Sequence, residues 1–465
     1  MEQQPDKQRE TFTSHFGLLM TMIGVAVGLG NVWRFPYMAW EFGGSAFIFL
    51  YLLAVLLIGI PALMCEWALG RHTRRGPLGA FARSGLPGGK YAGYLIFCVV
   101  MVAVGYYSAL VGWVGYFALG QLMNIVGNET FEASNILFPE QGFQAKSFFL
   151  QLMMTTIVVL GGGTVIAFGL KKGIERASKI IMPTLFVILI VLVVRSLTLP
   201  GAGAGLKWCF GSFRINEIAN SSTVAAAMGQ AIFSMSIGGS FMVIYGSYLD
   251  KKSLIPKNAI FTGLGDTAAA LLAALAIIPA TFALNPELTA GAAEEFSQAI
   301  GGPGLIFSTL PATFQKMPAG SFFGLLFFLG LFGAAFLSAI AALEVIVGGL
   351  VDNTSLTRKK AIVIVCAIVL VISLPPTINE KIFVPWDLTF GSGMQVVGTL
   401  LAVLACVWCV KRSEMLAELS AGGKPFPVWL YWWMRLVIPA IIIMTGVLWF
   451  SDNALPYLKG VFASS

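Results

Sequence analysis

Long apolar runs separated by short polar connections dominate the chain. Each run is long enough to cross roughly 30 Å of hydrocarbon, which takes about 20 helical residues. The pattern predicts an all-α, multi-pass membrane protein with about eleven transmembrane helices, near residues 16–39, 45–70, 91–124, 149–169, 178–199, 223–248, 258–284, 319–351, 359–377, 390–410 and 428–450. The first run lacks the cleavage pattern of a signal peptide, so we expect it to remain as a membrane span.

The composition fits a chain surrounded by a lipid bilayer. Of the 465 residues, 57% are hydrophobic and 11% are charged, whereas a soluble domain carries about a quarter charged residues. The net charge of +7 does not indicate a nucleic-acid partner, because the basic residues lie in short connections and form no basic face. Lys and Arg favour one set of connections by roughly three to one, which predicts a cytoplasmic N-terminus and an extracellular C-terminus in the cell membrane.

Two outer connections carry further features. The connection between the seventh and eighth spans, over residues 286–318, is amphipathic, and we expect it to form a lid over the external mouth. Another outer connection contains the triplet Asn128-Glu-Thr, which fits a glycosylation sequon, although such triplets are common by chance.

The sequence contains few residues suited to catalysis or to transition-metal binding. Five of the six cysteines lie in apolar runs and only Cys209 is expected in a loop, so neither a disulfide framework nor a zinc spacing follows. His15 and His72 lie far apart, which leaves little for a metal site or a catalytic triad. No Walker A loop or GxSxG motif is visible. We therefore expect no enzyme activity and no organic cofactor.

Two apolar runs contain residues that weaken a helix. The first run reads Gly24-Val-Ala-Val-Gly-Leu-Gly-Asn-Val-Trp-Arg-Phe-Pro36, and the sixth contains Ser234-Met-Ser-Ile-Gly-Gly-Ser240. Each glycine costs a helix about 1 kcal/mol relative to alanine. One interpretation is close helix packing through small residues. The other, favoured by two interruptions five spans apart, is a pair of broken helices that form a midplane binding site in an inverted repeat.

Broken helices have a specific use at membrane depth. The amides freed at the start of a half-helix attract a carboxylate, and freed carbonyls coordinate a cation. Bare backbone is tolerated there only if it is buried in protein or lines a cavity. The interruptions therefore indicate a site for a small ligand together with a cation.

The first run closely resembles the first-helix signature of the neurotransmitter:sodium symporter family, and the resemblance covers nearly the whole chain. Further matching segments follow in order, at Glu41-Phe-Gly-Gly-Ser-Ala-Phe47, Cys65-Glu-Trp-Ala-Leu-Gly-Arg71, Tyr106-Tyr107, Lys172-Gly-Ile-Glu-Arg176, Met182-Pro-Thr-Leu-Phe186, Gly229-Gln-Ala-Ile-Phe-Ser234, Ser247-Tyr248 and Met434-Arg435. Eleven spans resemble the shorter prokaryotic branch, whose members are sodium-coupled amino-acid transporters.

The resemblance implies a single transporter domain over residues 1–465, with a 5+5 inverted-repeat fold and unwound helices 1 and 6. The expected parts are a cytoplasmic segment at residues 1–15, repeat one at 16–199, repeat two at 223–411 and helix 11 at 428–450.

The resemblance also implies a ligand that carries its own carboxylate. Monoamine carriers of the family have an aspartate where this chain has Gly28, so the ligand should be an amino acid. By resemblance, its carboxylate would bind the amides of Leu29 and Gly30 and the hydroxyl of Tyr107.

The remaining substrate contacts are implied in the same way. The amino group would meet the carbonyls of Ala26, Phe233 and Ser234, with Ser236 nearby. The pocket walls would include three small residues, Ala103, Gly239 and Ala342. Since each missing methylene leaves room worth about 1 kcal/mol of apolar contact, we expect a large hydrophobic or aromatic side chain, such as that of tryptophan or tyrosine.

Two sodium sites are implied by the resemblance. The first would consist of Ala26, Asn31, Ser234 and Asp266, where Asp266 could alternatively be a carboxylate at a helix end. A buried anion beside sodium would remove the need for chloride. The second would consist of Gly24, Val27, Ala334 and Ser338. There the family usually offers another hydroxyl or carboxylate where this chain has Leu337, so this site is expected to be weak, hydrated or absent.

Charged residues within the spans are expected at gates. By resemblance, Arg34 and Asp387 form an outer gate above the substrate, closing through Tyr107 and Phe233. The inner gate would comprise Arg9, Asp352, Ser247 and Tyr248. Glu66 and Glu344 are expected to satisfy unwound backbone.

The function indicated is sodium-coupled symport of a hydrophobic amino acid by alternating access. The alternative within transport is a sodium-independent or proton-coupled amino-acid exchanger, which Leu337 makes plausible. A channel or a substrate-sensing receptor on the same fold is a further alternative, but a channel needs a continuous polar pore and no large signalling domain is attached.

Overall fold

The computed structural model describes residues 9–127, 143–211, 218–285, 307, 309–378, 382, 385–420 and 424–451. Within these ranges all regular elements are helices and no strand occurs. The first half contains α1 (His15–Ala26), η1 (Gly30–Arg34), α2 (Phe35–Glu41), α3 (Ser45–Ala54), η2 (Val55–Gly59), α4 (Ile60–Thr73), α5 (Pro77–Arg83), α6 (Gly89–Ile125), α8 (Ala145–Ala167), η3 (Leu170–Ile174), α9 (Glu175–Leu197) and α10 (Ala202–Phe210).

The second half has the same character. It contains α12 (Ser221–Ser234), α13 (Phe241–Gly246), α14 (Ile255–Leu284), α16 (Leu310–Gln315), α17 (Gly320–Asn353), α18 (Arg358–Ile378), η6 (Asp387–Gly393), α20 (Met394–Leu404), η7 (Ala405–Cys409), α21 (Arg412–Leu419), α22 (Val428–Trp432), η8 (Trp433–Val437) and α23 (Ile438–Trp449). The η segments are short π-helical stretches of five to seven residues.

The predicted spans are confirmed as helices. Among the described residues, nine helices are long and apolar enough to cross a membrane, and a bent pair, His15–Ala26 with Gly30–Glu41, makes a tenth. The remaining predicted span, the sixth at 223–248, is divided between α12 and α13, neither of which is long enough to cross alone. A helix satisfies its own backbone groups, which is why apolar runs in lipid take this form.

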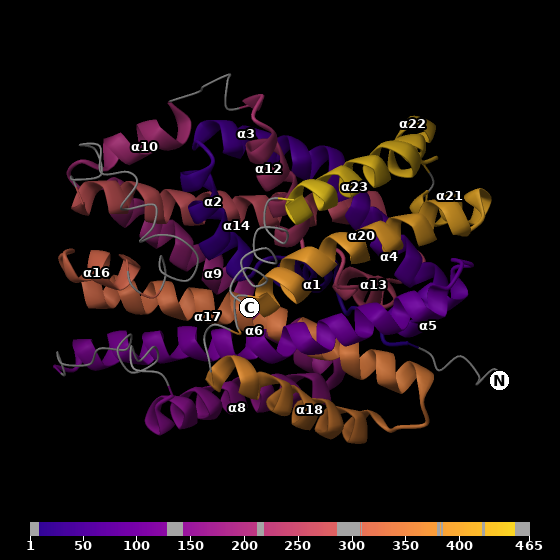
Figure 1. The fold of residues 1–465 in the computed structure, drawn as a ribbon, viewed down its shortest axis with the longest axis horizontal. Coiled ribbons are helices and arrows are strands. Elements are labelled where there is room, and N and C mark those ends of the chain that lie inside the picture. Colours follow the sequence, from indigo (N-terminus) through magenta and orange to yellow (C-terminus); the bar gives the residue numbers. More distant parts are fainter. Residues whose placement is uncertain are drawn as a thin grey trace, which may run out of the picture.

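The long helices lie side by side in one bundle (Figure 1). α6 and α17 pack along each other near its middle, and α17 is buried over nearly all of residues 334–349. The N-terminal segment, α13 and α21 lie at one end of the bundle, whereas α10 and α16 lie at the other (Figure 1). The first end corresponds to the predicted cytoplasmic side.

One expectation about the connections was wrong. Cys209 is not in a loop, because α10 forms after the fifth span and buries this thiol completely. α10 packs against α14. The sequon at Asn128 and residues 286–306 of the predicted lid lie outside the described residues, but α16 falls within the same connection.

The backbones of α4 and α13 are in direct contact through two glycines. A Cβ atom on Gly70 would lie 2.0 Å from the carbonyl oxygen of Val243, and one on Gly246 would lie 2.7 Å from the Cα atom of Trp67. Both distances are far below van der Waals contact, so only glycine permits this packing. The contact holds the second half of the sixth span against the second span.

We predict that Gly246→Ala will lower the thermal unfolding midpoint of the detergent-purified protein. The added methyl group must push α13 away from Trp67, and overpacking of this kind costs about 1–3 kcal/mol. Gly229→Ala is the matched control, because a Cβ atom at Gly229 in α12 meets nothing within 4 Å. Equal midpoints for the two variants would contradict the close approach.

Candidate functional site

The first span is broken at the position indicated by its glycines. α1 ends at Ala26, and Val27 leaves the helical conformation with φ −71° and ψ 119°. The helix resumes as η1, and the two halves meet at an angle of 58°. Ala26 is therefore the last residue before the break, and Gly28 to Gly30 form the start of the second half.

The sixth span is broken between α12 and α13. Ser236, Gly238 and Ser240 have φ values of 52°, 94° and 56°, a left-handed conformation that ends a helix. A side chain at Gly238 would collide with the carbonyl oxygen of Gln395 at 1.9 Å, so glycine is needed here. The interruptions are thus true breaks rather than packing surfaces of continuous helices.

Buried side chains satisfy the backbone freed by these breaks. Glu66 on α4 accepts a hydrogen bond of 2.6 Å from the Gly238 amide, as expected of a structural carboxylate. Gln230 donates to the carbonyl oxygen of Gly30 at 2.9 Å. Ser236 donates to the carbonyl oxygen of Val25 at 2.9 Å, which connects one break directly to the other.

Asn31, Ser234 and Asp266 meet between the two breaks. The Asn31 Nδ2 atom lies 2.6 Å from Asp266 Oδ1 and 2.8 Å from Ser234 Oγ. Ser234 Oγ donates to Asp266 Oδ2 at 2.7 Å. All three are at most 1% exposed. Asp266 lies in the middle of α14, so the alternative of a carboxylate at a helix end is wrong.

The donors around Asp266 are neutral. In the part of the chain that the structure describes, its side chain accepts hydrogen bonds from Asn31, Ser234 and Tyr51 only. A buried carboxylate without a positive partner is costly by several kcal/mol. The oxygens of Asp266 and Ser234 are the hard donors that an alkali or alkaline-earth cation prefers, and Ala26, whose carbonyl was expected in the same site, is the last residue of α1.

Tyr51 and Gln230 also contact this region, although neither was predicted from the sequence. Tyr51 on α3 is fully buried, and its hydroxyl lies 3.3 Å from Asp266 Oδ2 and 3.4 Å from Ser234 Oγ. A tyrosine inside an apolar run is a usable signal, since a buried hydroxyl needs a hydrogen-bond partner. Gln230 gives the same kind of signal, as an amide in a transmembrane run.

The implied carboxylate positions lie beside the first break. A Cβ atom on Gly28 would lie 3.2 Å from the Tyr107 hydroxyl and 2.7 Å from the Ser338 hydroxyl. The Tyr107 hydroxyl also forms a hydrogen bond with the backbone of Leu29. The Tyr107 hydroxyl therefore lies beside the Leu29 backbone at the start of the second half of the span, a place that suits a carboxylate.

The three small residues expected in the pocket wall are not equivalent. Ala103 on α6 is half-buried and Ala342 on α17 is 5% exposed. At Gly239, however, a Cβ atom would lie only 2.0 Å from the ring of Phe241. The space that Gly239 leaves is filled by Phe241, so the argument for a large substrate side chain rests on the two alanines.

The implied second cation site has three oxygens close together. Ser338 Oγ lies 3.3 Å from the Val27 carbonyl oxygen and 3.4 Å from that of Ala334. Leu337 points at Gly24, where a Cβ atom would lie 2.9 Å from Leu337 Cδ1. The Leu337 side chain thus offers a methyl group, and no oxygen, to this second cation site.

The implied outer gate lies above the first break. The guanidinium of Arg34 is 4.4 Å from the ring centroid of Phe233, and it interacts electrostatically with Asp387. The Phe233 ring packs against Gly30, where a Cβ atom would lie 2.8 Å from it. Arg34, Phe233 and Asp387 therefore gather on the side of the break that faces away from the N-terminus.

The implied inner gate is closed in this structure. Arg9 and Asp352 form an ion pair of 2.6 Å, and Arg9 also lies 5.2 Å from the ring centroid of Tyr248. Ser247 donates to the carbonyl oxygen of Ile244 and forms no bond with the pair among the described residues. The ion pair joins the segment before α1 to the end of α17.

The expected role of Glu344, to satisfy unwound backbone, is wrong. It does not bind unwound backbone; in the described residues it accepts from the Tyr248 hydroxyl and pairs with Arg358 at 2.6 Å. Tyr248 therefore connects the Glu344–Arg358 pair to Arg9. The sequence could not reveal this, because Glu66 and Glu344 both appear simply as acids in apolar runs.

Comparisons with known proteins agree with this geometry. The model of the sodium:neurotransmitter symporter family matches residues 9–134 and 129–457. The chain is similar to the sodium-dependent transporter YhdH of Bacillus subtilis, with 31% identity over 93% of this chain and 96% of the relative. It is also similar to the sodium-dependent transporter MJ1319 of Methanocaldococcus jannaschii, with 29% identity over 95% and 90%.

A solved structure extends the similarity to the fold. The crystal structure of MhsT in complex with L-phenylalanine superposes with a TM-score of 0.78 and 31% identity, over 94% of this chain and 99% of that one. The inverted-repeat transporter fold expected from the broken helices is thereby confirmed. The chain is a membrane protein and a member of the sodium:neurotransmitter symporter family.

Proposed function

We propose that this protein is a symporter that couples sodium entry to uptake of a hydrophobic, large or aromatic amino acid. The observation that carries the proposal is the buried Asp266 carboxylate between the two broken helices, with only neutral donors around it in the described residues. Transport proceeds by alternating access, with the N-terminus in the cytoplasm and gates on both sides of one central site.

Sodium supplies the positive charge that Asp266 requires. It binds Asp266, Ser234, the Ala26 carbonyl and the side-chain oxygen of Asn31. In this structure the Asn31 oxygen accepts from the Gly28 amide at 3.0 Å while its NH₂ group faces Asp266. Rotation of the amide presents the oxygen to the cation and frees the Gly28 amide. Sodium binding thereby changes the backbone at the substrate's carboxylate, which couples the two ligands.

The substrate class follows from charge and space. Gly28 offers no carboxylate to a ligand amine, whereas Tyr107 and the amides of Leu29 and Gly30 suit a ligand carboxylate. The related transporter MhsT was solved with L-phenylalanine, which supports an amino acid with a large apolar side chain. Ala103 and Ala342 leave the room for it, and Asp266 makes chloride unnecessary for charge balance at this site.

The ion pair between Arg9 and Asp352 closes the cytoplasmic side. Above the site, Arg34 and Phe233 are placed to close on the substrate together with Asp387. Alternation requires that one gate opens while the other is shut, and the break in the first span lets α1 tilt independently of η1.

We predict that Asp266→Asn will strongly weaken sodium-dependent substrate binding. The substitution keeps the size of the side chain and removes its charge, so the apparent sodium affinity should fall at least about tenfold. The apparent sodium affinity is measured by titrating sodium while recording the binding of a radiolabelled amino acid to the purified protein. Glu414→Gln is the control, because Glu414 is an exposed carboxylate. An unchanged sodium affinity would remove Asp266 from the site.

We predict that uptake into proteoliposomes will require an inward sodium gradient and will favour tryptophan, tyrosine or phenylalanine over glycine and alanine. Competition among the twenty amino acids measures the preference. Uptake that persists when sodium is replaced by a large organic cation at fixed pH would support the exchanger alternative instead. A preference for glycine or alanine would overturn the proposed substrate class but not sodium coupling.

We predict that Leu337→Thr will strengthen the second cation site. A hydroxyl there would join Ser338 and the Val27 and Ala334 carbonyls as a further hard donor. The Hill coefficient for sodium-dependent binding should rise from about 1 towards 2, with little change in substrate affinity at saturating sodium. A Hill coefficient near 2 in the unmodified protein would show that the second site already binds despite Leu337.

A further inference from the structure

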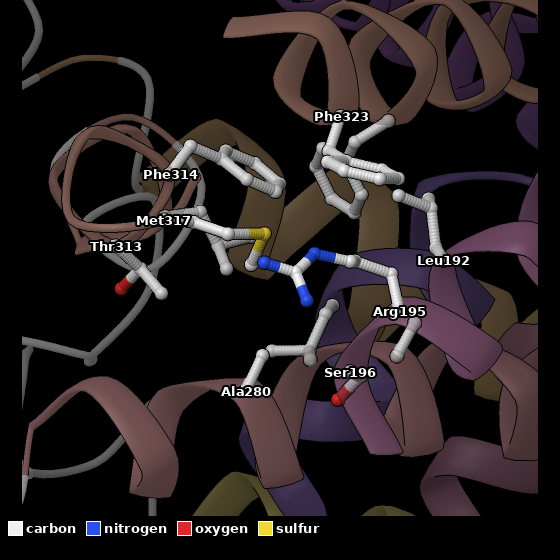
Figure 2. A pocket seen from close by; sticks show the side chains of 12 residues that line it. Leu192, Arg195, Ser196, Ala280, Thr313, Phe314, Met317 and Phe323 are labelled. Carbon is white, nitrogen blue, oxygen red and sulfur yellow. The ribbon is translucent and has the colours of Figure 1, made fainter. Parts of the chain in front are cut away.

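A small cavity lies away from the central site, at the end of the bundle opposite the N-terminus. It is enclosed by α9, α14, α16 and α17, and Figure 2 shows the side chains that line it. Its volume is about 20 Å³, and roughly 10–15 Å³ is enough for one water-sized particle. The cavity therefore has room for a single small ion or molecule and none for an amino acid.

The side chain of Arg195 enters this cavity from α9. Its guanidinium lies among Phe314, Met317 and Phe323 (Figure 2) and is 5.5 Å from the ring centroid of Phe323. Within the described residues the guanidinium has no ion pair and no hydrogen bond. Arg195 is half-buried. A guanidinium has five N–H donors and cannot lose its proton, so the part of it that lies in the cavity faces apolar side chains without a partner there.

A second polar group lines the same cavity. Ser196 is 1% exposed, and its hydroxyl has no hydrogen-bond partner among the described residues. Serine in a helix commonly donates to the carbonyl one turn earlier, as Ser178 does in the same helix. Ser196 does not, which leaves a buried donor on the residue that follows the half-buried Arg195.

We propose that this cavity is a binding site for a small monovalent anion of the halide class, held by the Arg195 guanidinium and the Ser196 hydroxyl. A monovalent anion balances the one charge of Arg195 and fits the volume. Its weaker hydration than that of a dianion suits the rings and aliphatic groups around it. Leu310, Thr313 and Phe314 of α16 line the cavity as well, so an anion bound there contacts both α9 and α16, although the Thr313 hydroxyl itself donates to the Thr309 carbonyl.

The site is separate from the sodium site. On α14 the cavity is lined by residues 276–280, which lie 10 to 14 positions beyond Asp266, or about 15–21 Å along the helix. The anion therefore does not balance sodium, and the expectation that transport needs no chloride at the central site is unaffected. Its effect is to hold α16, which belongs to the connection predicted to cover the external mouth.

The test is the thermal unfolding midpoint of the full-length purified protein in sodium chloride and in sodium gluconate at equal ionic strength and equal sodium. Chloride should raise the midpoint in a saturable manner, because a ligand that binds only the folded state stabilises it. Bromide should act like chloride. Equal midpoints in chloride and gluconate would mean that the cavity holds water, and would overturn the proposal.

Three variants test whether stabilisation by chloride arises at this cavity. Arg195→Gln should weaken the apparent chloride affinity at least about tenfold, and Ser196→Ala by several-fold. Lys146→Gln is the matched control, since Lys146 is an exposed cation at the same end of the bundle, and it should respond like the unmodified protein. A full chloride response in Arg195→Gln would overturn the assignment. If Arg195→Gln does not fold, Ser196→Ala tests the site in its place: a weaker chloride response supports the assignment and a full response overturns it.

Discussion

The fold depends on satisfying backbone groups that two broken helices expose at membrane depth. Lipid offers no hydrogen bonds, so a break survives only where other parts of the chain supply partners. Glu66 accepts from Gly238, Gln230 donates to Gly30, and Ser236 donates to Val25. These bonds come from the second and sixth spans, so neither break is stable without the bundle around it. The breaks therefore bring freed backbone together at one point inside the protein.

The same arrangement places one negative charge, the Asp266 carboxylate, in the interior of the bundle. Asp266 is buried on α14 beside both breaks, and its donors in the described residues are neutral. The site therefore lacks a positive charge to neutralise the Asp266 carboxylate. In the proposed mechanism a bound cation supplies that charge, and its binding alters the hydrogen bonds of the site. Asn31 connects the two events, because one face of its amide bonds Asp266 and the other bonds the Gly28 backbone. In the proposed mechanism, ion binding and substrate binding therefore share the Asn31 side chain.

Small residues serve two different purposes in this bundle. Gly70 and Gly246 allow the backbones of α4 and α13 to touch, and Gly30 admits the ring of Phe233. Gly239 looked like an open part of the substrate pocket, but Phe241 fills its space. A small residue thus indicates free volume only if no neighbouring side chain takes it, and that condition concerns the packed structure.

The sequence by itself predicted the helical spans and the two breaks, because apolar length and glycine clusters are local signals, and the family resemblance directed attention to Asp266. The sequence did not reveal the roles of Tyr51 and Gln230, the pairing of Glu344 with Arg358, or the burial of Cys209. Only the tertiary structure decided these, since each depends on which side chains meet across long separations. Asn31 and Asp266 are 235 positions apart, and packing of whole helices, rather than any pattern within one of them, brings them to 2.6 Å.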